Sequence, residues 1–343
     1  MMGDRFITKH DAKILQGIAV MLMVWHHLFA FPDRIIVPYT ECIVIFGVHV
    51  ESILSYAGRF CISMFSFISG YGMLKKYLNE RNKSIKAIYS KIVESLIKFY
   101  TNYWGICIIF VSYGFITGKY SVHLQELIKT ILGFSCTYNA EWWYISQYIG
   151  YLLVFPILLQ LVDITEKRPM YWIIFIAGFY MINKYILHIF IFEFLLCFIL
   201  GIIVVQYRIF DKIYSNKVSK YLIIIIGILM SFVRSLVYVQ SDKDYLFVLP
   251  IIFSILIFVK SKYCSNLFRQ SLQFIGRHSL NIWLIHTFWA YYYFQKITFS
   301  LYYSIPIYIV CIGASILSGV IINRLTIKCM NLDNLGRQDE KTN

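Results

Sequence analysis

The stretch AKILQGIAVMLMVWHHLFAF, residues 12–31, decides the fold class of this chain. It is almost wholly apolar, and its length is what an α-helix needs to cross the hydrocarbon core of a bilayer. No A-x-A cleavage pattern follows the run, so we expect a retained helix and not a signal peptide. The first span therefore predicts an integral membrane protein.

Comparable apolar runs continue along the chain, which is 59% hydrophobic and only 15% charged. We predict an all-α polytopic membrane protein with about ten transmembrane helices. The predicted spans are 12–31, 56–74, 95–117, 142–162, 170–188, 189–206, 219–239, 244–260, 272–295 and 303–322. The shorter apolar stretch 39–54 is expected to be interfacial or re-entrant. No remaining stretch is long enough to bury a core, so 1–330 is expected to be one membrane domain and 331–343 a polar cytoplasmic tail.

The lysines and arginines of the connecting loops predict the orientation. With the N-terminus in the cytoplasm, the few outer basic residues are Arg34, Lys119, Lys129, Lys184, Lys243 and Lys296. The inner loops and the C-terminus hold most of the others, so both termini are predicted to be cytoplasmic. This asymmetry explains the net charge of +14 without a nucleic-acid partner, which we do not expect. The eight cysteines show no CxxC spacing, so neither a metal site nor a disulfide framework is indicated.

Several polar residues lie within the predicted spans, where charged groups must pair or face water. Three of them lie at the cytoplasmic helix ends: Lys13, Gln16 and Arg277. The outer halves contain His27, Arg59, Glu193 and Arg234. For Arg59 and Glu193, snorkelling to the membrane interface is an equal alternative. We expect the outer group to line one cavity and to contact substrate.

The adjacent histidines His26 and His27 are the strongest indication of chemistry. A neutral imidazole can take a proton from a hydroxyl near physiological pH, as acyl transfer to an alcohol requires. The step of eleven residues from Gln16 to His27 turns a helix through about 1100°, so the two share a face about 16 Å apart along the axis. We therefore favour His27 as the catalytic residue. Packing of either ring against a neighbouring helix is the alternative.

Four motifs occur in an order that resembles the membrane acyltransferase-3 family, which acylates bacterial surface glycans and other acceptors. They are ILQGIAVMLMVWHH (14–27), FSFISGYGM (65–73), WWYISQYIGYLLVFP (142–156) and IGRHSLNIWLIH (275–286). The resemblance covers nearly the whole chain and implies a multi-pass protein of the bacterial inner or plasma membrane. It also implies acetyl-CoA as co-substrate, with no bound cofactor.

One position departs from the family pattern, in which an arginine precedes the catalytic histidine by eleven positions. Gln16 occupies that place, and an amide can form hydrogen bonds but supplies no charge. Lys13, one turn earlier, is the expected replacement, and Arg277 is expected to contact a nucleotide phosphate of the donor. For Arg277, the positive-inside rule is an equally good explanation.

Four further residues are expected near the acceptor. Ser69 lies among small residues that allow close helix packing, which is favoured over direct ligand contact. Trp142 and Trp143 are expected first of all to belong to the aromatic belt at the membrane interface. Stacking on a sugar ring is the functional alternative. Glu141 beside them would orient a hydroxyl or a histidine.

Together these features predict an O-acetyltransferase for a hydroxyl of a surface polysaccharide or its lipid-linked precursor. A direct transfer and an acyl-histidine relay both remain open. Buried charges among ten spans equally fit a transporter or flippase for a lipid-linked sugar. The ordered motifs favour the enzyme. An acyltransferase with a lipid, peptide or small-molecule acceptor is the third alternative.

Overall fold

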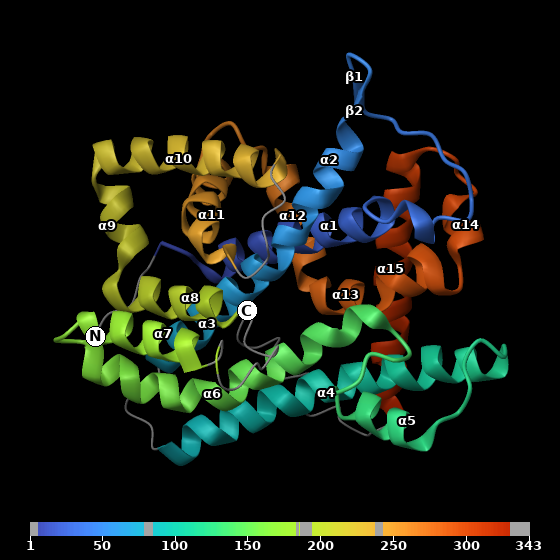
Figure 1. Ribbon diagram of the computed structural model, residues 1–343, viewed down its shortest axis with the longest axis horizontal. Helices are drawn as coiled ribbons and strands as arrows, with labels where there is room; N and C mark the ends of the chain where they lie inside the picture. Colours follow the sequence, from blue (N-terminus) through green and yellow to red (C-terminus); the bar gives the residue numbers. More distant parts are fainter. Residues whose placement is uncertain (1–5, 79–84, 183–184, 186–193, 237–242, 330–343) are drawn as a thin grey trace. The chain divides into compact units, whose positions relative to one another are not determined.

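The computed structural model describes residues 6–78, 85–182, 185, 194–236 and 243–329 (Figure 1). Chain contacts divide it into two compact units. Unit 1 comprises residues 1–30, 43–89 and 146–279, and unit 2 comprises residues 31–42, 90–145 and 280–343. The described residues are overwhelmingly helical, as predicted, and their sheet is a two-stranded ribbon of β1 (Val44–Ile45) and β2 (Val48–His49).

The elements of unit 1 are mostly long helices. They are α1 (Lys9–Phe29), α2 (Val50–Ala57), η2 (Gly58–Phe60), α3 (Cys61–Leu78), α7 (Met170–Ile182), α8 (Leu195–Tyr207), α9 (Ile209–Ser215), α10 (Lys217–Leu236), α11 (Tyr245–Lys260) and α12 (Asn266–Arg277). Unit 2 contains η1 (Pro32–Arg34), α5 (Leu124–Ile131), η3 (Ala140–Trp143), the π-helix η7 (Phe288–Tyr292), α14 (Gln295–Phe299) and α15 (Ser304–Cys329). Residues of both units belong to α4 (Ile85–Ile116), α6 (Tyr144–Thr165) and α13 (Ser279–Thr287).

Among the described residues, six helical segments are long and apolar enough to cross a membrane. They are Lys9–Phe29, Ile53–Leu78, Ile88–Ile116, Ala140–Thr165, Lys217–Ser235 and Ser304–Thr326. The predicted spans 12–31, 56–74, 95–117, 142–162, 219–239 and 303–322 fall on these segments. Shorter apolar helices occur at Met170–Ile182, Leu195–Tyr207 and Tyr245–Lys260. The predicted helix break near His188 and the tail 331–343 lie outside the described residues.

One predicted span differs from the structure. The range 272–295 is not one helix, because α12 ends at Arg277, where His278 leaves helical geometry at φ −96° and ψ 7°. A new helix, α13, begins at Ser279 and passes into the π-helix η7. The stretch 39–54 forms the ribbon and the start of α2, which is followed by η2 and α3.

The first helix begins at a capping box. Thr8 accepts a hydrogen bond from the Asp11 backbone N–H (3.1 Å), and Asp11 Oδ2 accepts one from the Thr8 backbone N–H (2.8 Å). This reciprocal arrangement satisfies N–H groups that a helix start otherwise leaves unpaired. Asp11 also forms an ion pair with Lys260 at 2.7 Å, which ties the start of α1 to the end of α11.

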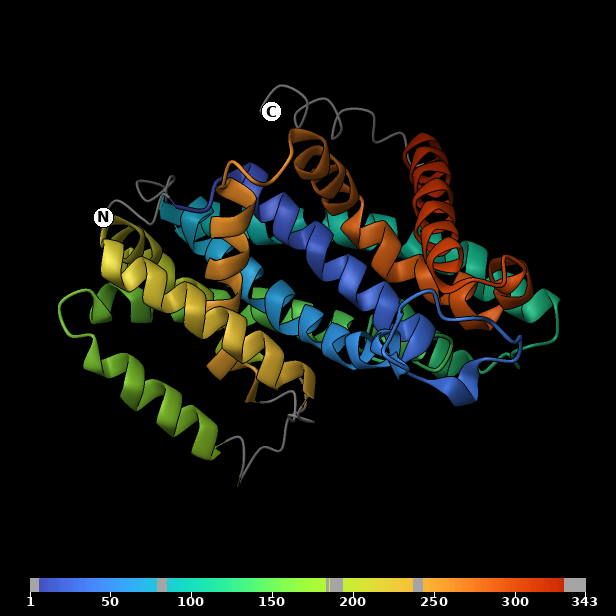
Figure 2. The ribbon, with the colours of Figure 1, turned by 90° about the horizontal axis from the view of Figure 1, so that it is seen from above.

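Glycines set the closest helix contacts in unit 1. A Cβ atom on Gly276 would lie 1.8 Å from the Lys13 carbonyl oxygen, and one on Gly17 would lie 2.2 Å from the Leu272 oxygen. The backbones of α1 and α12 therefore touch where they cross (Figure 2). The same holds for α3 and α8, because a Cβ on Gly70 would lie 2.0 Å from the Phe198 oxygen. Small residues permit this close approach between apolar helices.

Aromatic rings form the core of unit 2. Phe110 of α4 stacks on Phe288 of η7 with ring centroids 4.3 Å apart. Trp142 of η3 meets Phe288 and Tyr103 edge to face, at centroid distances of 5.8 Å and 5.1 Å. These contacts join α4, η3 and η7. They hold η3, the segment that directly precedes α6, in place.

Candidate functional site

The adjacent histidines lie in the last turn of α1 in unit 1. His26 is 9% exposed, and its Nδ1 atom lies 2.7 Å from the backbone oxygen of Ser55 in α2. Because a carbonyl oxygen only accepts, this hydrogen bond requires a proton on Nδ1 and leaves Nε2 as the basic nitrogen of a neutral ring. Gly58 permits this close approach of the two segments, because a Cβ atom at position 58 would lie only 2.9 Å from the Cβ of His26.

His27 is more accessible than its neighbour. Its ring is partly exposed, and its centroid lies 5.2 Å from that of His26 with the planes tilted by 51°. The two imidazoles are therefore close but differ in surroundings, one anchored to α2 and the other partly open. The assignment of His27 as the catalytic base stays a prediction.

The residues predicted to lie at the cytoplasmic helix ends come from α1 and α12, which pack against each other. Gly276 contacts the backbone of Lys13. The side chains of Lys13 and of Arg277, which follows Gly276, are therefore attached to neighbouring stretches of backbone. Both side chains are exposed, and no described carboxylate forms an ion pair with either of them. Gln16 is half-buried, and its Oε1 atom has no hydrogen-bond partner among the described residues. Two cations, Lys13 and Arg277, and the amide oxygen of Gln16 therefore lie on the stretches where α1 and α12 pack against each other.

Arg234 is buried in an ion pair. Its Nε atom lies 2.7 Å from Oδ1 of Asp244, and the two side chains are 6% and 0% exposed. Ser63 of α3 donates a hydrogen bond to Oδ2 of the same carboxylate at 2.8 Å. Asp244 was not among the predicted site residues, although its position ten residues after Arg234, across a predicted short loop, indicates a possible partner. The pair neutralises Arg234 and joins α3, α10 and the start of α11.

The other unit 1 residues predicted to lie in the outer halves of the spans have different surroundings. Arg59 is half-buried in η2 and acts electrostatically on Asp244. Ser69 is half-buried on α3, next to Gly70, which packs against α8. Glu193 lies outside the described residues.

The tryptophans of unit 2 differ in exposure. Trp142 is 1% exposed, and its Nε1 donates a hydrogen bond to the Leu284 backbone oxygen at 3.0 Å. Its ring is enclosed by neighbouring aromatics, so it offers no face for stacking on a sugar. Trp143 is half-buried and meets the ring of Tyr144 edge to face.

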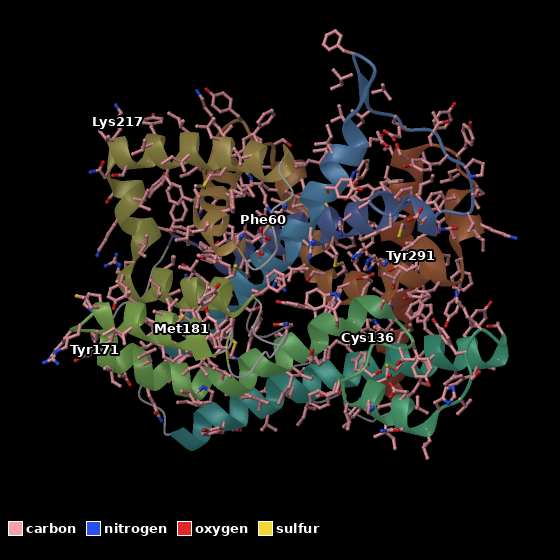
Figure 3. The ribbon with its side chains drawn as sticks, viewed as in Figure 1. Phe60, Cys136, Tyr171, Met181, Lys217 and Tyr291 are labelled. Atoms are coloured by element: carbon pink, nitrogen blue, oxygen red, sulfur yellow. The ribbon has the colours of Figure 1, made fainter. Side chains whose placement is uncertain are left out.

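Glu141 belongs to a hydrogen-bonded group that the sequence analysis did not anticipate. Its Oε1 atom accepts hydrogen bonds from Arg34 at 3.0 Å and from the Tyr291 hydroxyl at 2.9 Å. Tyr291, labelled in Figure 3, comes from the π-helix η7. A π-helix is a rare deviation that occurs often at functional sites. The three residues are far apart in the chain, so no local pattern connected them.

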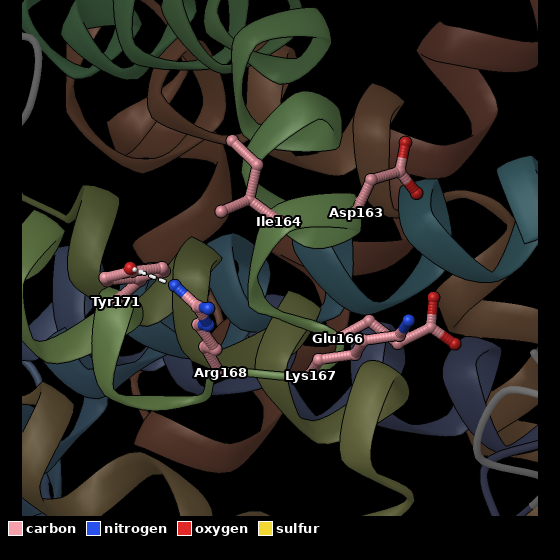
Figure 4. A pocket seen from close by; sticks show the side chains of 6 residues that line it. All are labelled: Asp163, Ile164, Glu166, Lys167, Arg168 and Tyr171. Carbon is pink, nitrogen blue, oxygen red and sulfur yellow. Dashed lines mark hydrogen bonds between the residues drawn. The ribbon is translucent and has the colours of Figure 1, made fainter.

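An open pocket lies in unit 1 where α6 ends and α7 begins (Figure 4). Its lining residues are Asp163, Ile164, Glu166, Lys167, Arg168 and Tyr171. Arg168 donates a hydrogen bond to the Tyr171 hydroxyl at 2.9 Å. None of the predicted site residues lines this pocket. Within the described ranges, no group of three or more His, Cys, Asp or Glu side chains is placed to hold a metal ion.

A family model described as an acyltransferase domain matches residues 10–324 of the 343-residue chain. No curated protein and no solved structure matches the chain.

Proposed function

Because the chain belongs to the acyltransferase-3 family and is an acyltransferase, we propose that it moves an acetyl group from acetyl-CoA to a hydroxyl of a cell-surface polysaccharide or its lipid-linked precursor. The observation that carries this proposal is the layout of α1. A cationic group occupies its beginning and a histidine pair its last turn. Family membership also favours an enzyme over the transporter that the buried charges alone would allow.

The beginning of α1 suits the donor. Coenzyme A carries phosphates on its nucleotide, and two exposed cations without a carboxylate partner among the described residues attract such groups. Lys13 and Arg277 would bind the phosphates, while the Gln16 amide would form a hydrogen bond to the same part of the molecule. Arg277 thereby supplies, from α12, charge that Gln16 does not supply from α1.

The last turn of α1 suits the proton transfer. In our proposal His27 takes the proton of the acceptor hydroxyl as the oxygen attacks the thioester carbonyl carbon. The carbon–sulfur bond breaks, and the proton passes to the departing thiolate. Gln16 and His27 are about 16 Å apart along the axis, a span that the pantetheine arm covers. His26, anchored to Ser55, would hold the shape of the turn beside it.

Stabilisation of the developing oxyanion falls to Arg59 in this scheme. Arg234 has its charge neutralised by Asp244, so we assign it to positioning the outer ends of α3, α10 and α11. Arg59 lies in η2, immediately after the helix that anchors His26. A cation near a developing negative charge lowers the barrier most when it is held in place beforehand.

We place the protein in the bacterial inner or plasma membrane with ten spans and both termini in the cytoplasm. This orientation gives the donor group access to cytoplasmic acetyl-CoA and turns the histidine end of α1 toward the outer side. Glu141 and Trp143 would then belong to the acceptor side, together with Ser69, whereas Trp142 is enclosed in the core of unit 2.

The decisive experiment measures acetyl transfer by purified protein in nanodiscs, using labelled acetyl-CoA and surface glycan from a deletion strain. We expect His27→Ala to abolish transfer while retaining donor binding, and His26→Ala to reduce transfer less. Wild-type transfer by a correctly inserted His27→Ala protein would remove His27 from the mechanism. Labelled donor given without acceptor separates direct transfer, which leaves the protein unlabelled, from an acyl-histidine relay.

A further inference from the structure

Arg34 is held in place at its backbone. It closes the short helix η1 in the loop after α1, and two hydrogen bonds from one buried side chain fix this loop. Gln295, which is 4% exposed, donates from Nε2 to the Arg34 carbonyl at 2.8 Å. Its Oε1 accepts from the Ile36 backbone N–H at 3.0 Å. Both halves of the amide are therefore used to set the position of one arginine.

The guanidinium of Arg34 is held as well. One nitrogen, Nη1, donates to Oε1 of Glu141 at 3.0 Å and lies 3.2 Å from the Tyr291 hydroxyl. The ring of Phe31 lies under the group, with Cζ 4.2 Å from its centroid. Together these contacts fix both the plane of the guanidinium and its rotation.

One edge of this fixed group remains available. The contacts with Glu141 and Tyr291 use Nη1 alone, while Nε and Nη2 have no partner among the described residues. The side chain is 39% exposed. Nε–H and Nη2–H form a planar fork whose spacing matches the two oxygens of a carboxylate or phosphate. An arginine immobilised in advance loses less entropy when it binds such a group.

A second cation, Lys119, lies over an aromatic ring next to Tyr291. Lys119 lies over the ring of Tyr292, with Nζ 5.2 Å from its centroid, and the rings of Tyr291 and Tyr292 are 4.8 Å apart. Arg34 and Lys119 bring two positive charges to these rings. The carboxylates of Glu141 and of Asp33, which precedes Arg34 in η1, balance these charges in number. The preference for an anion therefore comes from the open fork of Arg34 and not from net charge. A surface ion pair alone contributes only about 0–1 kcal/mol to stability and requires no backbone clamp.

We propose that Arg34 recognises an oxyanion on the acceptor, so that the acceptor is an acidic saccharide carrying a carboxylate or a phosphate. This inference rests on the proposed function for its choice of a saccharide. Glu141 and Tyr291 position the guanidinium, and the Nε–Nη2 edge forms a bidentate contact with the acid. Neutral saccharides lack this contact.

The test is binding of oligosaccharides to the full-length protein in nanodiscs without donor, measured by calorimetry. The probes are oligogalacturonate, oligoglucuronate and a sugar phosphate, and each uronate is paired with its neutral methyl ester. We expect an acidic probe to bind more tightly than its neutral partner, and Arg34→Gln to weaken that binding roughly tenfold. The uronate and phosphate arms identify which acid is recognised.

Two variants separate recognition from structure. Arg34→Lys retains the charge but not the fork and is expected to lose most of the preference for acid. Lys296→Gln removes a nearby exposed cation of α14 and is expected to change nothing. Equal affinity for charged and neutral probes across the set, or an equal loss in Lys296→Gln, overturns the proposal. Acid-selective binding without any acetyl transfer would refute the proposed function and leave this site standing.

Discussion

The Nδ1 atom of His26 and the backbone oxygen of Ser55 lie 2.7 Å apart, which joins the end of α1 to α2. Replacement of His26 by Phe retains a flat ring but removes this hydrogen bond. Loss of a hydrogen bond costs about 0.5–1.5 kcal/mol, so we expect a lower unfolding temperature for His26→Phe than for the wild type. Thermal unfolding in detergent, followed by size-exclusion chromatography, measures it. An unchanged midpoint would show that the hydrogen bond contributes nothing.

Gly276→Ala is expected to disrupt the crossing of α1 and α12. The added Cβ would lie 1.8 Å from the Lys13 oxygen, which is backbone and cannot rotate away. Overpacking of this kind costs about 1–3 kcal/mol and should also weaken acetyl-CoA binding by moving Arg277. Gly178→Ala in α7 is the control, because nothing lies within 4 Å of a Cβ there. Equal donor affinity in the two variants would contradict the role of the crossing.

The buried pair of Arg234 and Asp244 gives a third prediction. Removing one partner leaves an uncompensated buried charge, so Arg234→Met and Asp244→Leu should each destabilise by about 3–5 kcal/mol. The double variant Arg234→Met with Asp244→Leu should recover much of this loss, because both charges are gone. Unfolding of the four proteins forms a double-mutant cycle. Additive losses would mean that the two residues do not act as a pair.

A carboxylate of α5 in unit 2 predicts a pH effect. Hydrogen bonds from Lys129, Ser135 and Thr137 lower the pKa of Glu126 from 4.5 to about 2. A depressed pKa means that the charged form stabilises the folded α5 and the turn that follows it, fully above about pH 4.5 and progressively less as the pH falls toward about 2. Hydrogen exchange of peptides covering 124–137 should therefore lose protection in that window, and Glu126→Gln should remove the dependence. A variant with the same pH profile as the wild type would rule this out.

The sequence determined the helical, membrane-embedded class of the protein. An apolar run such as residues 12–31 must form a helix in hydrocarbon, because the backbone has no other partner for its N–H and C=O groups. Local composition therefore sufficed for the six candidate spans that the structure shows. It also sufficed to single out the histidine pair and the cations Lys13 and Arg277, although their roles remain predictions.

The tertiary structure decided which polar residues have partners. Arg34 and Glu141 are 107 positions apart, and their hydrogen bond depends on how η1 and η3 meet within unit 2. From the sequence, Arg234 is predicted to contact substrate, whereas in the structure it is paired with Asp244. Stacking on a sugar ring is an alternative role for Trp142 in the sequence, whereas in the structure its ring is enclosed. Hydropathy is a property of neighbouring residues in the chain, whereas burial and charge pairing arise only when distant segments pack. For that reason the sequence alone placed the six candidate spans, and only the folded chain separated residues that stabilise it from those that can meet a substrate.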